Sequence, residues 1–233
     1  MTVRVLWRMV AANVQMTLEY RGAFVVYMLS TVLAPVISLL VWLTVSEQGV
    51  GLPFSRGQLV TYYLLLSVVS MLTATWLGDY LAQRIRTGKI SPWLLIPAPY
   101  ILRDAGNNIG EKIIKLPLLL PMVAVVALLF RDDVRLPTAP SAWLLFVVCL
   151  PMTAAVAFLL DFVIGSLAFW IQDVNGLIRL KTLVGAFFAG QFVPLAFFPP
   201  ALSPLLEVQP FRYTLSFPLE VLTGGLSDVQ LST

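Results

Sequence analysis

The sequence offers few side chains that could carry out catalysis. Histidine is absent from the 233 residues, which excludes a histidine general base, a serine or cysteine nucleophile activated by histidine, and histidine-ligated zinc. Cys149 is the single cysteine and lies in an apolar run, so disulfides and thiolate metal clusters are also excluded. Asp79 and Asp161 remain as a conceivable carboxylate pair, but Asp79 lies beside Gly78 and Tyr80 at the boundary of an apolar run. We therefore expect no catalytic residue.

The sequence also lacks the residues that would bind and hydrolyse ATP. The run Thr87-Gly88-Lys89-Ile90 has neither the hydroxyl residue after lysine nor the upstream glycine of a phosphate-binding loop. We expect no cofactor and no metal in this chain, so any ATP must be hydrolysed by a partner. The net charge of +3 is small, and the basic residues are not interleaved with aromatic ones, so nucleic acid is not expected as a partner.

The composition is typical of a membrane protein. Hydrophobic residues make up 59% of the chain and charged residues only 12%, whereas a soluble domain contains about 25% charged residues. Such a chain has too little polar surface to cover its core in water. We therefore expect an all-α integral membrane protein whose polar groups are satisfied within helices.

Five apolar runs are long enough to cross about 30 Å of hydrocarbon as helices. The predicted spans are residues 24–45, 58–77, 113–130, 143–170 and 182–197. Small residues four apart in the fifth span, such as Gly185 and Ala189, permit close helix approach, within one subunit or between two. Residues 201–233 are broken by prolines and hold no further span.

The basic residues predict the orientation, because an excess of Lys and Arg marks cytoplasmic connections. With the N-terminus inside, eleven of the fifteen lie on the cytoplasmic side: Arg4, Arg8, Arg21, Arg84, Arg86, Lys89, Arg103, Lys112, Lys115, Arg179 and Lys181. Four lie outside: Arg56, Arg131, Arg135 and Arg212. Residues 1–21 have an apolar and a polar face, so we expect an interfacial helix, or alternatively a polar start of the first span.

The predicted cytoplasmic loop between the second and third spans, 84–103, is the most informative segment. Ser91 can cap a helix that starts at Pro92, and Pro97 prevents its continuation. The resulting short helix, 92–96, is apolar and lacks a core of its own. It must bury itself against lipid, as a simple anchor, or against another protein, with Gly88 as a pivot before it.

Several blocks carry a family resemblance. The basic run with Gly88, followed by Leu94-Leu95-Ile96-Pro97, resembles the first cytoplasmic loop of type-2 ABC exporter permeases. Residues 168–176 and 194–199, with later prolines and Gly224, resemble the bacterial subgroup associated with drug and antibiotic export.

The resemblance implies an N-terminal interfacial helix, six spans, a coupling helix, and a re-entrant extracellular hairpin, here 198–225. It implies a multi-pass permease of a bacterial inner membrane, working with a second permease subunit and with ABC ATPase subunits that bind ATP and Mg. The last span of the family is missing from these residues, so we expect a truncated or incomplete member. The expected ATPase contacts are Arg84, Arg86, Gly88, Lys89, Trp93, Leu94 and Leu95.

Four residues are candidates for the translocation path: Asp161, Phe197, Phe198 and Phe211. Asp161 interrupts an uncharged helix, and an intramembrane carboxylate is a functional candidate by default. Alternatively, Arg179 or Lys181 neutralises it, or it lies near the inner interface. The three phenylalanines lie in a proline-rich segment that fits two half-helices capping the path, or an ordinary outer loop.

Two other functions compete with the exporter. An ion-coupled secondary transporter would usually show internal repeats with paired broken helices, and no convincing repeat is present. It also leaves the short helix in the basic loop unexplained. A membrane-embedded enzyme would rest on Asp79 and Asp161 alone.

Overall fold

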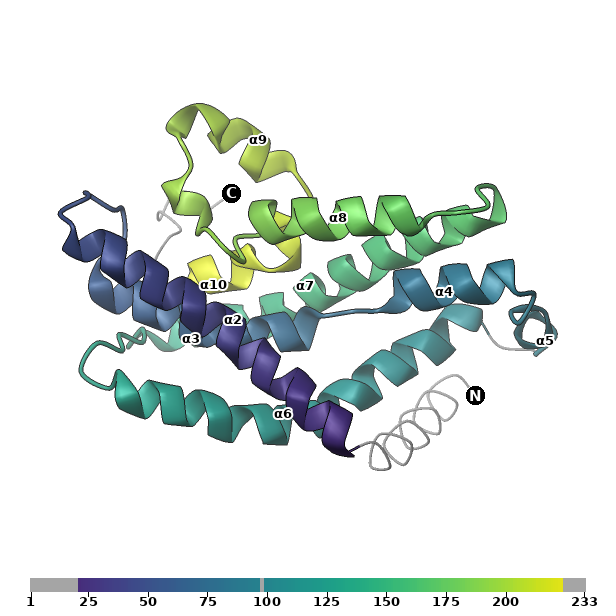
Figure 1. The fold of residues 1–233 in the computed structure, drawn as a ribbon, viewed down its shortest axis with the longest axis horizontal. Coiled ribbons are helices and arrows are strands. Elements are labelled where there is room, and N and C mark those ends of the chain that lie inside the picture. Colours follow the sequence, from purple (N-terminus) through teal and green to yellow (C-terminus); the bar gives the residue numbers. More distant parts are fainter. Residues whose placement is uncertain (1–20, 97–98, 224–233) are drawn as a thin grey trace.

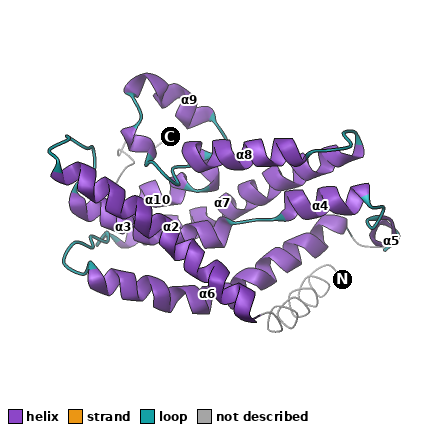
Figure 2. Ribbon diagram, in the orientation of Figure 1, coloured by secondary structure: helices purple, strands orange, loops and turns teal. Residues whose placement is uncertain are grey.

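The computed structural model describes residues 21–96 and 99–223, and within these ranges its regular elements are all helical, as predicted (Figure 2). The α-helices are α2 (Arg21–Glu47), α3 (Arg56–Thr73), α4 (Leu77–Arg86), α5 (Ser91–Leu94), α6 (Tyr100–Leu129), α7 (Pro140–Ser166), α8 (Asn175–Phe188), α9 (Ser203–Val208) and α10 (Ser216–Thr223). Short 3-10 turns follow α7 and punctuate the chain after α8. The predicted interfacial helix, 1–21, lies almost entirely outside the described residues.

Four helical stretches are long and apolar enough to cross a membrane: Met28–Glu47, Arg56–Arg86, Tyr100–Leu129 and Pro140–Phe169. They overlap the first four predicted spans. The second stretch is broken at 74–76, where α3 ends and α4 begins (Figure 1). The Asn108 side chain donates a hydrogen bond to the Ala74 carbonyl at 3.2 Å, which satisfies part of this break.

The chain differs from the sequence prediction at the fifth span, 182–197. Helix α8 begins at Asn175 and ends at Phe188. Its 14 residues cover about 21 Å, less than the hydrocarbon thickness. Beyond Phe188 the backbone turns irregular, because Gly190 takes a positive φ of 81° and Pro194 cannot donate to a helix.

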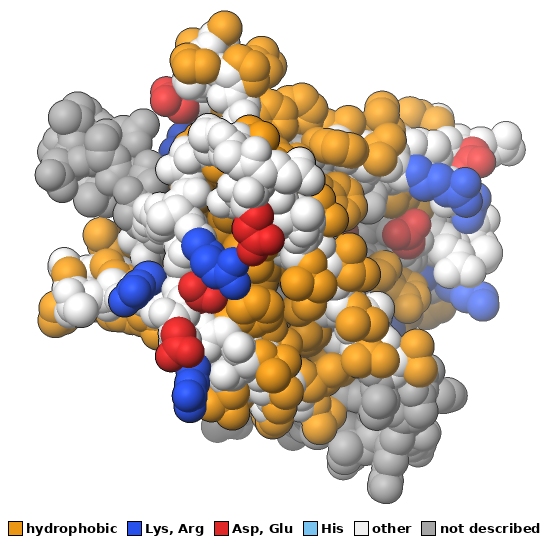
Figure 3. Space-filling view, turned by 60° about the vertical axis from the view of Figure 1, so that its left-hand side comes forward, with side chains coloured by type: hydrophobic (Ala, Val, Ile, Leu, Met, Phe, Trp, Pro, Cys, Tyr) orange, Lys and Arg blue, Asp and Glu red, His pale blue; other side chains and the backbone are white. Residues whose placement is uncertain are grey.

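Helix α7 is arranged inside out, with polar residues buried and apolar residues exposed. In α7 the buried residues are Thr153, Asp161 and Gly165, whereas apolar residues such as Leu144 and Val163 are exposed. Figure 3 shows a broad band of hydrophobic side chains between two groups of charged ones. This pattern suits a surface that faces lipid, where apolar exposure carries no cost and polar side chains turn inward.

Helix α3 forms the centre of the bundle and packs against α2, α6, α7 and α10. Its buried residues include both tyrosines of the main core, Tyr62 and Tyr63. At one end, a capping box between Ser55 and Gln58 starts α3. Arg56 there forms ion pairs with Glu47 and Asp133, which link α3 to the end of α2 and to the α6–α7 connection.

Candidate functional site

The turn between α4 and α5 fixes the start of the short helix. Gly88 has a φ of 68°, a conformation that glycine adopts without strain. The Ile90 side chain is buried, and its carbonyl accepts hydrogen bonds from the backbone N–H groups of Trp93 and Leu94. The predicted Ser91 cap is wrong, because Ile90 occupies the cap position without a side-chain bond and Ser91 is already helical. The helical turn therefore begins one residue earlier than predicted.

Two polar contacts hold this turn against α6. The Arg103 guanidinium lies over the Trp93 ring, 3.5 Å from its centroid. Arg84 Nη1 forms an ion pair with the buried Asp104 carboxylate at 2.8 Å and also donates to the Tyr100 hydroxyl. Helix α5 is thus attached to α4 and α6 rather than hanging from a free loop, although it is only four residues long.

The apolar side chains at the end of α5 remain exposed. Leu94, Leu95 and Ile96 are 58%, 85% and 45% exposed, respectively. Among the predicted ATPase contacts, Gly88 and Lys89 are exposed beside them, and Trp93 is half-buried beneath Arg103. Arg84 instead faces the protein interior. The structure therefore brings together most of the predicted contacts on one surface and places Arg84 behind it.

A neighbouring apolar strip was missed by the sequence analysis. Phe169, Trp170 and Ile171 follow the end of α7 and are exposed. Leu94 and Phe169 both line a hollow of about 610 Å³ between the two segments. Trp170 was predicted only as the inner end of a span; three consecutive large apolar residues before Gln172 were the available signal. We call Leu94, Leu95 and Ile96 together with Phe169, Trp170 and Ile171 the coupling surface.

Replacing Arg84 by methionine is expected to destabilise the permease itself, because Asp104 would remain buried without its partner. Breaking a buried pair in this way costs about 3–5 kcal/mol, which a thermal unfolding measurement in detergent would detect. Lys89→Met is the matched control, since Lys89 is exposed and should change only partner binding. Equal melting temperatures for wild type and Arg84→Met would contradict a structural role for Arg84.

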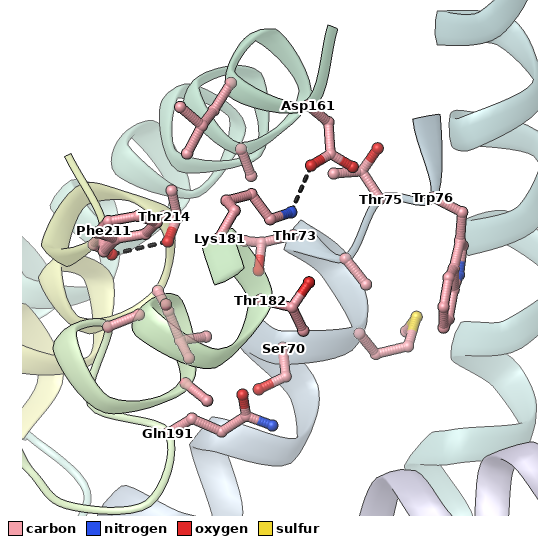
Figure 4. A pocket seen from close by; sticks show the side chains of 18 of the residues that line it. Ser70, Thr73, Thr75, Trp76, Asp161, Lys181, Thr182, Gln191, Phe211 and Thr214 are labelled. Carbon is pink, nitrogen blue, oxygen red and sulfur yellow. Dashed lines mark hydrogen bonds and ion pairs between the residues drawn. The ribbon is translucent and has the colours of Figure 1, made fainter. Parts of the chain in front are cut away.

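A second site is a cavity of about 390 Å³ between α2, α3, α4, α7 and α8 (Figure 4). Hydroxyl side chains and small residues form much of its wall. Its charged lining residues are Asp79, Asp161 and Lys181. Volumes of 300–1,000 Å³ are usual for small-molecule sites, so the cavity is large enough to hold a ligand.

Asp161 joins three helices at the wall of this cavity. Lys181 of α8 forms an ion pair with its carboxylate (Figure 4). The backbone N–H of Gly78, in the first turn of α4, donates to Oδ2 at 3.4 Å. A Cβ on Gly165 would lie 2.9 Å from the Gly78 carbonyl, so α4 and α7 touch through their glycines. Arg179 and Lys181 were both predicted as possible partners of Asp161, and in the structure Lys181 forms the ion pair.

The end of α8 is closed by five side-chain hydrogen bonds, which we call the α8 clamp. These side chains donate hydrogen bonds to backbone carbonyls that no longer have a partner within the helix. Such carbonyls need a donor from the protein where water is excluded. The bonds are Gln209 Nε2 to Phe188 O, Ser216 Oγ to Ala189 O, Tyr62 Oη to Gly190 O, and Tyr63 Oη and Trp42 Nε1 to Phe192 O, at 2.6–2.9 Å. Ala189 and Gln191 also line the cavity.

The predicted path residues separate into two groups. Asp161 and Phe211 both line the cavity. Phe197 packs edge-on against Trp42 and Phe54 in the main core. Phe198 stacks on Phe188, with ring centroids 6.1 Å apart, and does not line the cavity. The small residues of α8 meet the same chain, since a Cβ on Gly185 would contact the Phe211 ring at 3.3 Å.

Apolar exposed helices, buried charges and short broken helices define a multi-pass membrane protein with an internal cavity. A family model described as "ABC-2 family transporter protein" matches residues 32–231. The chain therefore belongs to the ABC-2 transporter family, as the sequence resemblance predicted. A comparison with curated proteins found no match. Membership identifies a permease, the membrane component of an ABC transporter, and implies partnership with an ABC ATPase.

Proposed function

We propose that this permease is the membrane-spanning subunit of an ATP-driven exporter and takes its energy from a separate ATPase subunit. It works as a dimer with a like subunit and two ATPase subunits, which bind ATP and Mg. It lies in the inner membrane of a bacterium with its N-terminus inside. The basic residues that cluster at the α4–α6 end support this orientation.

The exposed apolar end of α5 carries the proposal. Leu94, Leu95 and Ile96 are exposed, and the contacts of Arg103 and Arg84 with the neighbouring helices present them as a fixed projection. An exposed apolar patch with basic neighbours is typical of a protein interface. We expect an ATPase groove to cover the coupling surface.

Helix α4 provides a route from the coupling surface to the cavity. Its last turn leads into the α5 turn, and its first turn holds Asp161 through Gly78 (Figure 1). The ten residues between these points form a rigid rod of about 15 Å. A displacement of α5 would therefore move the wall of the cavity, and two positions of α4 would correspond to inward-open and outward-open arrangements.

The segment after α8 fits the expected re-entrant hairpin, 198–225, as far as Thr223. Within the described residues, α9 has six residues and α10 has eight, and α10 packs on α3 and α7. We propose that α8, the α8 clamp and these half-helices complete the outer half of the path. A cavity with apolar and hydroxyl walls is compatible with drug or antibiotic export, the subgroup that the sequence resembles.

Leu94→Asp combined with Leu95→Asp is expected to abolish co-purification of the ATPase, because two carboxylates would be desolvated in an apolar interface. The measurement is a pull-down of an ABC ATPase subunit co-expressed with the permease, with permease folding checked by thermal melting. Leu205→Asp with Val208→Asp adds the same charges to exposed positions on α9, away from α5 (Figure 1). Undiminished co-purification with the α5 variant would refute the proposed ATPase contact.

A further inference from the structure

The charges around the cavity leave a negative excess. Its charged lining residues are Asp79, Asp161 and Lys181. Lys181 is already paired with Asp161, whereas Asp79 is an exposed lining residue with no ion pair within the described part of the chain. The N-terminus of α4 offsets about half a unit charge, which does not neutralise the second carboxylate. The electrostatic potential of the cavity therefore favours a positive ligand.

Three of the hydroxyl groups in the wall share one polarity. Thr73, Thr182 and Thr214 each donate to a backbone carbonyl of their own segment, at 3.0, 2.9 and 2.7 Å. A carbonyl can only accept, so each hydroxyl proton is already used. These oxygens can therefore interact with a ligand only as hydrogen-bond acceptors, through their lone pairs. At these three positions the wall can accept a hydrogen bond from a ligand but has no proton left to donate.

Ser70 adds an unsatisfied group to the same wall. Its Oγ is buried and has no hydrogen-bond partner among the described residues. Figure 4 shows Ser70 on the cavity side, near Gln191. A buried hydroxyl without a partner costs free energy, which a ligand that supplies a partner would recover.

The remaining wall is apolar and suits a hydrophobic body. Its residues include Pro35, Met71, Leu160, Ile178 and Leu215. Small side chains, such as Ala186, leave the volume open. A ligand that fits both parts has a group rich in N–H donors and positive charge, attached to an apolar body.

We infer that this cavity binds amphipathic organic cations with a protonated amine, held by Asp79, Asp161 and the hydroxyl lone pairs. The inference rests on the proposed function, since it assigns a substrate class to the proposed path. Lys181 and the amine compete for the same carboxylate. Ligand binding therefore loosens the link between α7 and α8 while α4 keeps its bond to Asp161.

The test uses three dansyl probes that share a fluorophore and a five-carbon chain and end in an amine, an acetylated amine or a carboxylate. Binding is measured by fluorescence on the full permease in zwitterionic nanodiscs, with empty nanodiscs as the background. We expect the amine to bind at least about tenfold more tightly than either other probe, consistent with a difference of about 1.4 kcal/mol. Equal affinity for all three probes would overturn the inference.

Three variants locate the binding. Asp79→Asn should weaken amine binding about tenfold, whereas Asp132→Asn, the same change at an exposed position outside the cavity, should have no effect. Ala186→Phe should fill the cavity and abolish binding. Thr182→Val keeps every charge and removes one hydrogen-bond acceptor, so we expect the affinity for the amine probe to fall a few-fold. Amine binding that survives both Asp79→Asn and Ala186→Phe would place the probe elsewhere.

Failure of this inference is separable from failure of the exporter proposal, because the binding assay contains no ATPase. Loss of probe preference with intact ATPase co-purification would remove only the substrate class. Amine binding with no ATPase partner would leave the ligand site standing and remove the energy source.

Discussion

Lys181→Met is expected to lower the stability of the permease by about 3–5 kcal/mol, because it leaves the Asp161 charge buried without its partner. Asp161 is only 3% exposed, and its remaining contact in the structure is the Gly78 N–H at 3.4 Å. One hydrogen bond to a helix N-terminus cannot replace a full ion pair. Thermal unfolding of the purified protein in detergent measures the loss.

The matched experiment is a double-mutant cycle. Adding Asp161→Asn to Lys181→Met should recover most of the lost stability, because the buried charge is then gone. Arg56→Met is the exposed comparison, since surface pairs such as Arg56–Glu47 contribute about 0–1 kcal/mol. Additive effects of the two substitutions would show that Asp161 and Lys181 do not interact. Full transport by Asp161→Asn would remove Asp161 from the path.

Gly190→Ala is expected to disrupt the α8 clamp. A Cβ at Gly190 would lie 2.5 Å from the Tyr62 hydroxyl and would also collide with Ser216 Oγ. Both hydroxyls must move, which breaks their bonds to the carbonyls of Gly190 and Ala189. The positive φ adds about 1–2 kcal/mol, and each carbonyl left unsatisfied adds about 1–3 kcal/mol. We expect a large fall in melting temperature or failure to purify as a folded protein.

Gly49→Ala separates these two causes. Gly49 has a φ of 77°, close to that of Gly190, but a Cβ there would meet nothing within 4 Å. It should therefore show only the backbone cost of about 1–2 kcal/mol. Similar melting temperatures for the two variants would mean that the contacts of Tyr62 and Ser216 contribute little.

Hydropathy was sufficient to predict the first four apolar stretches, because lipid imposes a length and a composition on every span. It did not predict the break at 74–76, since the segment contains no proline or glycine and the break depends on Asn108 from α6. The end of α8 was missed for a related reason. Its irregular carbonyls are stabilised by donors from α2, α3 and α10, which are remote in sequence.

At the coupling surface, too, local sequence predicted some features and long-range packing determined the others. Pro92 and Pro97 predicted a short helix, but it begins one residue earlier, after the buried Ile90. The proximity of Phe169 to Leu94 required the packing of α4 against α7, which no local pattern contains. Sequence alone also offered Arg84 as a partner contact, because the pairing with Asp104 spans 20 residues and a turn.

The α8 clamp has a consequence for the cooperativity with which the end of α8 can open. Its five donors converge on a stretch of five residues, 188–192, so parting this segment breaks all five hydrogen bonds together. At about 1 kcal/mol each, spontaneous opening would occur in fewer than about one molecule in a thousand. The same groups that complete a short helix therefore make the opening of this segment an all-or-none event.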